Sequence, residues 1–405
     1  MKHAKYSDQT TKWLITAILI LLVFLVCICL HVFGKKTLEI PVENSVPNIS
    51  ASVSTAPMKP TVTSIRFSAS GDNLIHDGLY LQAKNRATDG GYDFKALYEN
   101  VAPYYQNFDV NWINQETLVT DELQPSSYPC FCSPTAVAKE LYKIGFRAFS
   151  MSNNHSYDKS AIGIDATLRF WDTMPDDVLY TGFYRGSEDY SNITVQEKNG
   201  IKIAYLAYTE STNGISLPQG ATANVIYTSQ TDVIEAQIKQ ARQIADVVMA
   251  CVHWGTENSH VVNENQRALA QQMADWGADV IIGTHPHVVQ PIEMITASSG
   301  KSVPVFYSLG NFVSTQAQAD NLIGMIANFD IIKTVEPNGP AEISIENIHA
   351  EPIIMHYDSG FRNARVYLAK DYTEELASSH GNRTITKKYI ETVFAENIKP
   401  EFLNS

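Results

Sequence analysis

The segment Val280-Ile281-Ile282-Gly283-Thr284-His285-Pro286-His287 is the clearest structural signal in this chain. Its apolar start over residues 280–282 is typical of a short buried strand. Two histidines follow, and the proline between them restricts the backbone so that both imidazoles are presented from one turn. The segment therefore predicts a strand that delivers reactive side chains to one edge of a sheet. The alternative is that His285 and His287 are two unrelated polar loop residues.

A second segment has the same design. The apolar run 247–252 predicts another buried strand, and His253-Trp254-Gly255 follows it directly. A single histidine at a strand end is usually a hydrogen-bonded loop residue. The parallel with His285 favours a metal ligand instead, because imidazole is accepted by borderline divalent ions. Glu257 follows at a turn, where it either orients a ligand or is simply solvated.

Three more strand ends lie in the first half of the chain. Asp72 follows a predicted strand over 65–69 and Gly71, Glu116 follows a strand over 109–113, and Asn154 follows a strand over 148–151. Carboxylate and carboxamide oxygens complete the ligand set that hard and borderline ions prefer. Turn formation is the alternative role for the two carboxylates. The metal ligands that we predict are Asp72, Glu116, Asn154, His253, His285 and His287.

His155 lies beside a predicted ligand without being needed as one. An imidazole in that place can protonate a leaving group, so His155 is the predicted catalytic residue. The alternative role of this polar segment is to cap the helix that follows, which fits Asp158 better. His76, four residues after Asp72, is either a ligand or a residue that faces the pocket.

Strands and helices alternate along most of the chain, which predicts an α/β sandwich rather than two independent domains. Asn199-Gly200 predicts a hairpin turn between strands over 193–197 and 201–208. The remaining predicted strands cover 303–308, 322–332 and 342–354. The predicted helices cover 134–144, 162–171, 233–245 and 265–276.

The start of the chain has a different composition. Residues 13–33 contain no charged side chain, and a helix of that length would be roughly 30 Å long, which matches a bilayer. A cleavable signal peptide is the alternative, but its apolar region is usually about 7–15 residues. We expect a cytoplasmic tail at 1–12, a transmembrane signal-anchor at 13–34, a flexible linker at 35–64, a folded domain at 65–360 and a C-terminal helical extension at 361–405. That topology places the folded domain outside the cytoplasm.

The composition and net charge of the chain indicate which classes of protein it can belong to. The chain has 405 residues, of which 44% are hydrophobic and 18% charged, as expected for a protein that buries a core. A net charge of −13 argues against nucleic acid as a partner, because phosphate binding needs a basic surface. Cys130 and Cys132 are too close in sequence for an easy disulfide, and no pair of cysteines has zinc-binding spacing.

Taken in order, the motifs resemble those of the CapA family of capsule and poly-γ-glutamate biosynthesis proteins. The motifs are Gly71-Asp72, Asn114-x-Glu116, Asn153-Asn154-His155-x-x-Asp158, His253-Trp254-Gly255-x-Glu257, His285-Pro286-His287-Val288-x-Gln290 and Ser308-Leu309-Gly310-Asn311-Phe312. That family is similar to the calcineurin-like metallophosphoesterases. The resemblance implies a four-layer αββα sandwich resembling metallo-dependent phosphatases, here preceded by one transmembrane helix.

The resemblance also implies roles for the motif residues. Asp72 and His287 would serve one metal, Asn154, His253 and His285 the other, and Glu116 would bridge. One or two divalent ions are expected, drawn from Mn, Zn, Fe and Mg. His76, Asp158, Glu257, Gln290 and Asn311 are expected around the ligands or against the substrate.

The function implied is a membrane-anchored, extracytoplasmic hydrolase of amide or ester bonds in an anionic capsule polymer, with poly-γ-glutamate as the expected polymer. Membrane synthase subunits are further expected partners. Two alternatives remain: a non-catalytic subunit of a polymer synthase or export complex, and a metallophosphatase. Against the phosphatase, the spacing from Asp72 to His76 is longer than in ordinary phosphoesterases, and Ser156 stands where they have an acidic residue.

Overall fold

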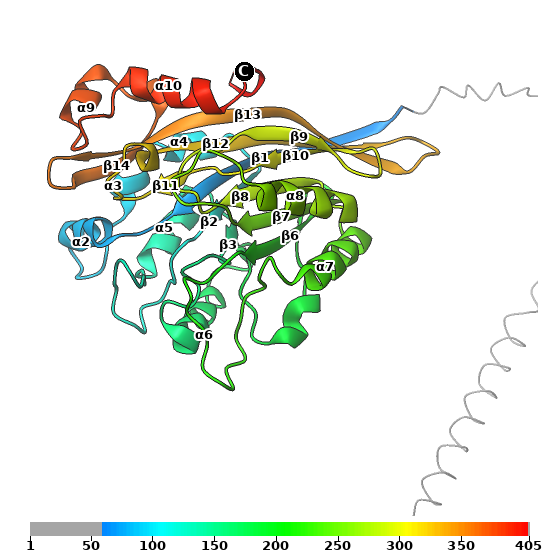
Figure 1. Ribbon diagram of the computed structural model, residues 1–405, viewed down its shortest axis with the longest axis horizontal. Coiled ribbons are helices and arrows are strands. Elements are labelled where there is room, and N and C mark those ends of the chain that lie inside the picture. The colour runs from blue at the N-terminus through cyan, green and yellow to red at the C-terminus, as the bar shows by residue number, and fades with distance from the viewer. Residues whose placement is uncertain (1–58, 404–405) are drawn as a thin grey trace, which may run out of the picture. The chain divides into compact units, whose positions relative to one another are not determined.

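The computed structural model describes residues 59–403, which form an α/β fold around two β-sheets (Figure 1). The first sheet has eight strands in the order β14-β13-β12-β1-β2-β3-β4, and β11 pairs with β1. Its strands are β1 (Thr61–Asn73), β2 (Val110–Asn114), β3 (Ala148–Ser150), β4 (Leu179–Thr181), β11 (Asn311–Val313), β12 (Ile323–Val335), β13 (Ala341–Asp358) and β14 (Arg362–Leu368).

The second sheet has six strands in the order β5-β6-β7-β8-β10-β9. They are β5 (Thr194–Lys198), β6 (Ile201–Thr209), β7 (Val247–His253), β8 (Val280–Thr284), β9 (Ile292–Thr296) and β10 (Ser302–Phe306). The β5–β6 hairpin turns at Asn199 and Gly200, which have φ values of 51° and 73°. These left-handed conformations are those that the predicted Asn-Gly turn requires.

The two sheets pack face to face, and aromatic side chains from both meet between them. Phe329 of β12 stacks on Phe67 of β1 at 4.9 Å between ring centroids and on Phe306 of β10 at 5.8 Å. The β1–β2–β3–β4 and β6–β7–β8–β10 pairs are all parallel. The carboxyl ends of these parallel strands therefore collect at common sheet edges.

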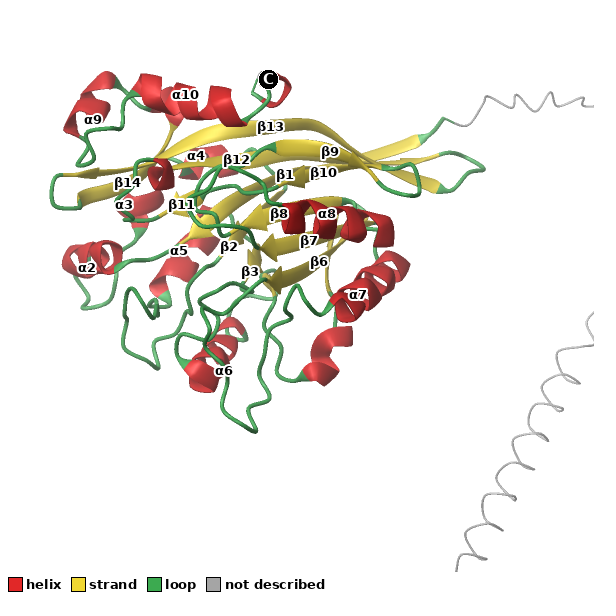
Figure 2. Ribbon diagram, in the orientation of Figure 1, coloured by secondary structure: helices red, strands yellow, loops and turns green. Residues whose placement is uncertain are grey.

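Helices cover the outer faces of the sheets (Figure 2). α7 (Thr231–Ile244) and α8 (Glu264–Trp276) bury their apolar sides against the second sheet, where Ile238 and Met273 join a separate core cluster. α2 (Asp77–Arg86) and α3 (Lys95–Tyr98) contact β14 of the first sheet. The other helices are α4 (Ala102–Tyr105), α5 (Ala136–Ile144), α6 (Ser160–Trp171), α9 (Glu374–Ser379) and α10 (Lys387–Asn397).

The ends of the fold differ from the predicted boundaries. β1 begins at Thr61 rather than after residue 64, because residues 61–64 pair with residues 332–335 of β12. Strand β14 lies inside the predicted C-terminal helical extension and pairs with β13. The extension therefore begins as part of the first sheet, and helices follow only from Glu374.

The expected architecture also included a transmembrane helix, and this part is corrected. Within residues 59–403 no helix is long and apolar enough to cross a membrane. The longest described helix, α7, has 14 residues, or roughly 21 Å at 1.5 Å per residue, against a hydrocarbon core of about 30 Å. The predicted span at 13–33 lies outside the described residues.

Candidate functional site

The predicted ligands meet where the parallel strands of both sheets end. Asp72 lies near the end of β1, and Glu116 follows β2 by two residues. Asn154 follows β3, His253 is the last residue of β7, and His285 follows β8. The site therefore takes its side chains from both sheets.

Three donor atoms converge on one point. Nε2 of His253 lies 2.9 Å from Oδ1 of Asn154 and 3.1 Å from Nδ1 of His285. Two nitrogens on a tetrahedral zinc ion would be separated by about 3.3 Å, given bonds of about 2.05 Å. Nδ1 of His253 is 2.9 Å from Oγ1 of Thr284, a contact that fixes the ring orientation. His253 thus lies at ligand spacing from both Asn154 and His285.

The second group forms around Asp72 and His287. Oδ2 of Asp72 lies 3.2 Å from Nδ1 of His287 and accepts the backbone N–H of His285 at 3.3 Å. Nδ1 of His287 also lies 3.0 Å from Oδ1 of Asn311, which leaves Nε2 facing Glu116 at 3.7 Å. His285 and His287 have φ values of 98° and 60°, so this turn holds both rings at a cost in backbone strain.

Glu116 lies near both groups, and its surroundings indicate whether the site suits a cation. The residue is fully buried, and neither carboxylate oxygen has a hydrogen-bond partner within the described residues. Oε1 lies 3.5 Å from Nε2 of His253 and 3.7 Å from Nε2 of His287. Donor atoms of Glu116, His285 and His287 all lie within 4.8 Å of one another. An unpartnered buried carboxylate among imidazole nitrogens fits a divalent metal ion.

The electrostatics agree with that fit. Burial, followed by the nearby charge of Asp72, raises the pKa of Glu116 well above its usual range. Burial lowers the pKa of His253 well below its usual range and that of His285 to about 3. Both imidazoles are therefore neutral at pH 7, which is the form that binds metals. Burial opposes charge on His287, but Asp72 outweighs it and raises the pKa.

His155 forms a pair with Asp158 beside this cluster. Nδ1 of His155 lies 2.8 Å from Oδ2 of Asp158, whose side chain is fully buried. The same oxygen accepts the backbone N–H of Phe131 at 2.5 Å, and the Phe131 ring packs edge-to-face on His155 at 4.6 Å. Because the carboxylate accepts the Nδ1 proton, Nε2 is the nitrogen left for chemistry. Asp158 thus orients His155 and does not cap the helix with its side chain.

Some of the other predicted residues lie close to the predicted metal ligands, and others do not. Asn311 contacts His287, as described above. Glu257 is exposed on the loop after β7, yet its charge raises the pKa of Glu116. Gln290 does not reach the cluster, since its buried amide bonds the carbonyl of Ser259 and the side chain of Gln266. His76 lies outside the Glu116–His285–His287 group.

The sequence analysis missed three side chains that hold the ligands. Asn114 donates from Nδ2 to Oδ1 of Asp72 at 2.7 Å, and Thr284 contacts His253. Both end a strand, so the reasoning applied to Asp72 could have found them. Asn213, on the loop between β6 and α7, accepts from Nδ2 of Asn154 at 3.3 Å. No strand end or sequence spacing marks it.

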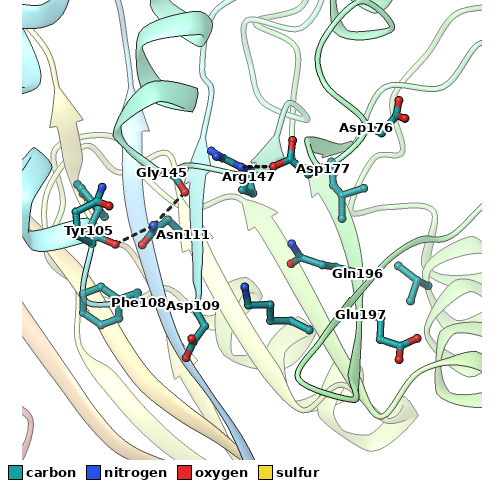
Figure 3. A pocket seen from close by; sticks show the side chains of 14 residues that line it. Tyr105, Phe108, Asp109, Asn111, Gly145, Arg147, Asp176, Asp177, Gln196 and Glu197 are labelled. Carbon is teal, nitrogen blue, oxygen red and sulfur yellow. Dashed lines mark hydrogen bonds and ion pairs between the residues drawn. The ribbon is translucent and has the colours of Figure 1, made fainter.

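A separate cavity of about 540 Å³ lies at the opposite ends of the strands (Figure 3). Its lining includes Asn111 near the start of β2, Arg147 before β3 and Gln196 of β5. Arg147 pairs there with Asp177 at 2.7 Å. None of the predicted site residues lines this cavity, so it is distinct from the histidine cluster.

The fold and the site together define an α/β protein in which Glu116, His285 and His287 form a group that could hold a metal ion where strands of the two sheets end. The chain belongs to the bacterial capsule synthesis protein PGA_cap family, whose model matches residues 66–316. The resemblance to the CapA family seen in the sequence motifs is thereby confirmed.

Two relatives support this assignment. The PGA biosynthesis protein CapA of Bacillus subtilis is 32% identical over 222 residues, which cover 55% of this chain and 56% of that protein. The capsule biosynthesis protein CapA of Bacillus anthracis is 31% identical over 229 residues, covering 54% of each chain. The chain thus spans about half the length of the curated relatives that it matches.

Among solved structures, the NAD nucleotidase NadN of Haemophilus influenzae aligns over 85% of this chain and 65% of its own, with 12% identity and a TM-score of 0.41. A 5′-nucleotidase of Staphylococcus aureus aligns over 82% and 58% with 11% identity and a TM-score of 0.41.

Proposed function

We propose that this protein is a metal-dependent hydrolase that cleaves amide or ester bonds in a capsule polymer, with poly-γ-glutamate as the substrate. The observation that supports the proposal most is the Glu116 carboxylate, buried without a partner among the nitrogens of His253 and His287. A purely structural core would leave that carboxylate at a large desolvation cost. In a site that binds cations, the same carboxylate would serve as a ligand.

The ligands divide as the resemblance implies. Asn154, His253 and His285 would hold one divalent ion, Asp72 and His287 a second, and Glu116 would contact both. Mn, Zn, Fe and Mg are all compatible with a mixed nitrogen and oxygen donor set. When bound, such ions activate water and stabilise negative charge on the reacting group.

The chain's own residues supply the proton transfer. Asp158 holds the Nδ1 proton of His155 and stabilises the ring when it is charged. The Nε2 nitrogen of His155 is then available to protonate the leaving group, while Phe131 shields one side of the pair from water. Asn213 contacts both Asn154 and Nδ1 of His155, so it steadies the ligand and the acid together.

The same proposal includes a polymer substrate, partner proteins and a cellular location. The relatives' names refer to capsule and PGA biosynthesis, which favours an anionic polymer as substrate. We expect the folded domain to act outside the cytoplasm, at the cell membrane, beside subunits of a polymer synthase. Protease accessibility in intact protoplasts tests the location, and cross-linking in membranes tests the partners.

The decisive experiment measures metal content and turnover on the same preparations. Purified protein is assayed on γ-linked glutamate oligomers and on aryl phosphates, with His155→Asn as the test variant and His349→Asn as the control. His155→Asn should keep its metal and lose roughly 10²–10⁴-fold in rate, whereas His349→Asn should keep both. Turnover of aryl phosphates alone would establish the phosphatase alternative. Normal polymer production in cells that carry only His155→Asn would establish a non-catalytic subunit.

A further inference from the structure

His76 is the histidine near the site whose role the sequence left open between ligand and pocket residue. It precedes the first residue of α2 with an extended backbone and is partly buried, as is the predicted ligand His285. The side-chain hydrogen bonds of His76 within residues 59–403 use Nδ1 alone. The ring is therefore anchored by one nitrogen, and the other is left for a different partner.

The identity of the Nδ1 partner sets the tautomer. The backbone N–H of Thr315 lies 3.3 Å from Nδ1 of His76 and can only donate. Nδ1 must accept that hydrogen bond, so the ring proton sits on Nε2. The carbonyl oxygen of Leu74 lies 3.2 Å from the same nitrogen and can only accept, so it competes with Thr315 for the tautomer. A backbone N–H is left unpaired more rarely than a carbonyl oxygen, so the Thr315 amide decides the tautomer.

The surroundings of the ring keep it neutral and close to the reacting groups. Burial is the main cause that lowers the pKa of His76 to about 4, and the charges of His287 and His155 contribute to that shift. Phe131 packs edge-to-face on His76 at 5.1 Å and on His155 at 4.6 Å, so both imidazoles lie against the same aromatic ring. His76 is thus a neutral N–H donor close to the His155–Asp158 pair.

We propose that His76 binds the substrate rather than a metal, by donating its Nε2–H to an anionic oxygen of the bound ligand. The proposal rests on the proposed function, because it takes the histidine cluster to be the place where the ligand binds. The oxygen belongs either to a carboxylate or to a phosphate. A neutral donor suits both, since a hydrogen bond to a charged acceptor is stronger than one between neutral groups.

Three substitutions at His76 distinguish the contributions of its Nε2 donor, its Nδ1 acceptor and its aromatic ring. His76→Gln places a carboxamide nitrogen about where Nε2 stands and so keeps the donor. His76→Asn keeps an acceptor for the Thr315 amide but loses the distant donor. His76→Phe keeps the ring that packs on Phe131 and loses both nitrogens. Each is prepared as the full chain loaded with Mn²⁺, and its metal content and melting temperature are measured beside the wild type.

The readout is the dissociation constant for two probes, a γ-linked glutamate oligomer and inorganic phosphate, measured by calorimetry. We expect His76→Gln to bind within about 3-fold of the wild type. His76→Asn and His76→Phe should bind about 10-fold or more weakly, as for the loss of a hydrogen bond to a charged group. Metal content should not change in any variant. The probe whose binding weakens identifies the carboxylate or the phosphate as the acceptor.

Other outcomes overturn the proposal in distinguishable ways. Loss of Mn²⁺ from all three variants would make His76 a ligand. Normal binding by His76→Asn with weak binding by His76→Gln would reduce its role to holding the Thr315 amide. Unchanged binding by all three variants would remove His76 from the binding site while leaving the proposed function intact. Failure of the wild type to bind either probe would instead refute the proposed function, and His76's role with it.

Discussion

The chemistry of single residues explains why the site suits a cation. Glu116 is fully buried with two unpartnered oxygens, and burial raises its pKa well above the usual range. In the absence of a metal the group is most stable as a neutral carboxylic acid. A divalent ion would instead stabilise the charged carboxylate, so protons and metal compete for this one side chain.

Replacing Glu116 by glutamine should therefore act in opposite directions on two quantities. The free energy of unfolding of the metal-free protein at pH 7 should stay the same or rise, because glutamine neither carries a charge to bury nor has to take up a proton on folding. Metal affinity should fall by at least about 10-fold, because a charged ligand is lost. Chemical denaturation in a chelator and a Mn²⁺ titration measure the two effects. Glu257→Gln, which changes the same charge on an exposed residue, should reduce affinity only a few-fold.

The glycine before Asp72 is fixed by close packing. A Cβ on Gly71 would lie 1.8 Å from the carbonyl oxygen of Gly310, whose carbonyl also accepts the backbone N–H of Asp72 at 3.0 Å. Gly71→Ala should destabilise the fold by about 3 kcal/mol and displace Asp72. Gly78→Ala is the matched control, since its Cβ meets nothing closer than 3.6 Å and alanine favours a helix by about 1 kcal/mol. Equal melting temperatures for the two variants would contradict this reading.

Sequence reasoning at this scale works for residues that end strands and fails for those from other loops. Asp72, His253 and His285 follow apolar runs, so the runs predict that each lies at the carboxyl end of a buried strand. Asn213 and Phe131 reach the site from loops without such a pattern. Only the packing of the two sheets brings those loops to the same place.

At the scale of elements, amphipathic helices and buried strands are predicted to within a few residues. α7 (Thr231–Ile244) was expected at 233–245, and α8 (Glu264–Trp276) at 265–276. α2 (Asp77–Arg86) was missed because its buried residues, Leu79 and Ala83, give no repeating apolar face. The three-residue strands β4 and β11 were missed as well, because they are too short to show a period and depend on neighbours for pairing.

The C-terminal segment carries its own titrating group. His380, which follows α9, donates from Nε2 to the carbonyl of Met355 at 3.0 Å and accepts the backbone N–H of Asn382 on Nδ1 at 2.8 Å. The neutral ring satisfies both partners, whereas a proton on Nδ1 would break the second bond. Burial is the main cause that lowers the pKa of His380 to about 4, and the nearby charge of His356 contributes to that shift.

The unfolded chain therefore binds more protons than the folded one between about pH 6.5 and pH 4, and stability should fall as the pH falls through that window. For this histidine the loss is at most about 3 kcal/mol. Denaturant unfolding at pH 7 and pH 5 measures it. His380→Gln keeps a donor for Met355 and does not titrate, so its stability should depend less on pH. A slope equal to that of the wild type would assign the effect to other groups, such as His356.

At the scale of the whole molecule, the candidate metal centre depends on the pairing of two sheets that the sequence does not specify. The order β14-β13-β12-β1-β2-β3-β4 puts β1 beside β12, although some 250 residues separate them in the chain. The alternation of strands and helices predicts parallel pairing but says nothing about which strands leave one sheet for the other. The strand pattern predicted an α/β sandwich, and the family resemblance added the four-layer αββα arrangement.

Because Asp72, Glu116 and Asn154 come from the first sheet and His253 and His285 from the second, a bound ion would cross-link the two sheets. Metal should then stabilise the whole fold rather than one loop. At 100 times its dissociation constant, a ligand that binds only the folded state adds about 2.7 kcal/mol, which should raise the melting temperature by roughly 5 °C. Adding a chelator should reverse the shift. Hydrogen exchange should slow on adding Mn²⁺ at the carboxyl ends of β1 and β7 together.

The triple variant His253→Ala, His285→Ala and His287→Ala removes all three imidazole ligands that end or follow strands of the second sheet and leaves the carboxylates of the first. Its melting temperature should be the same with Mn²⁺ and with chelator, and its exchange rates should no longer respond to metal. Stabilisation that survives in this variant would mean that the ion binds to one sheet only. The six predicted ligands would then not form a single centre between the sheets.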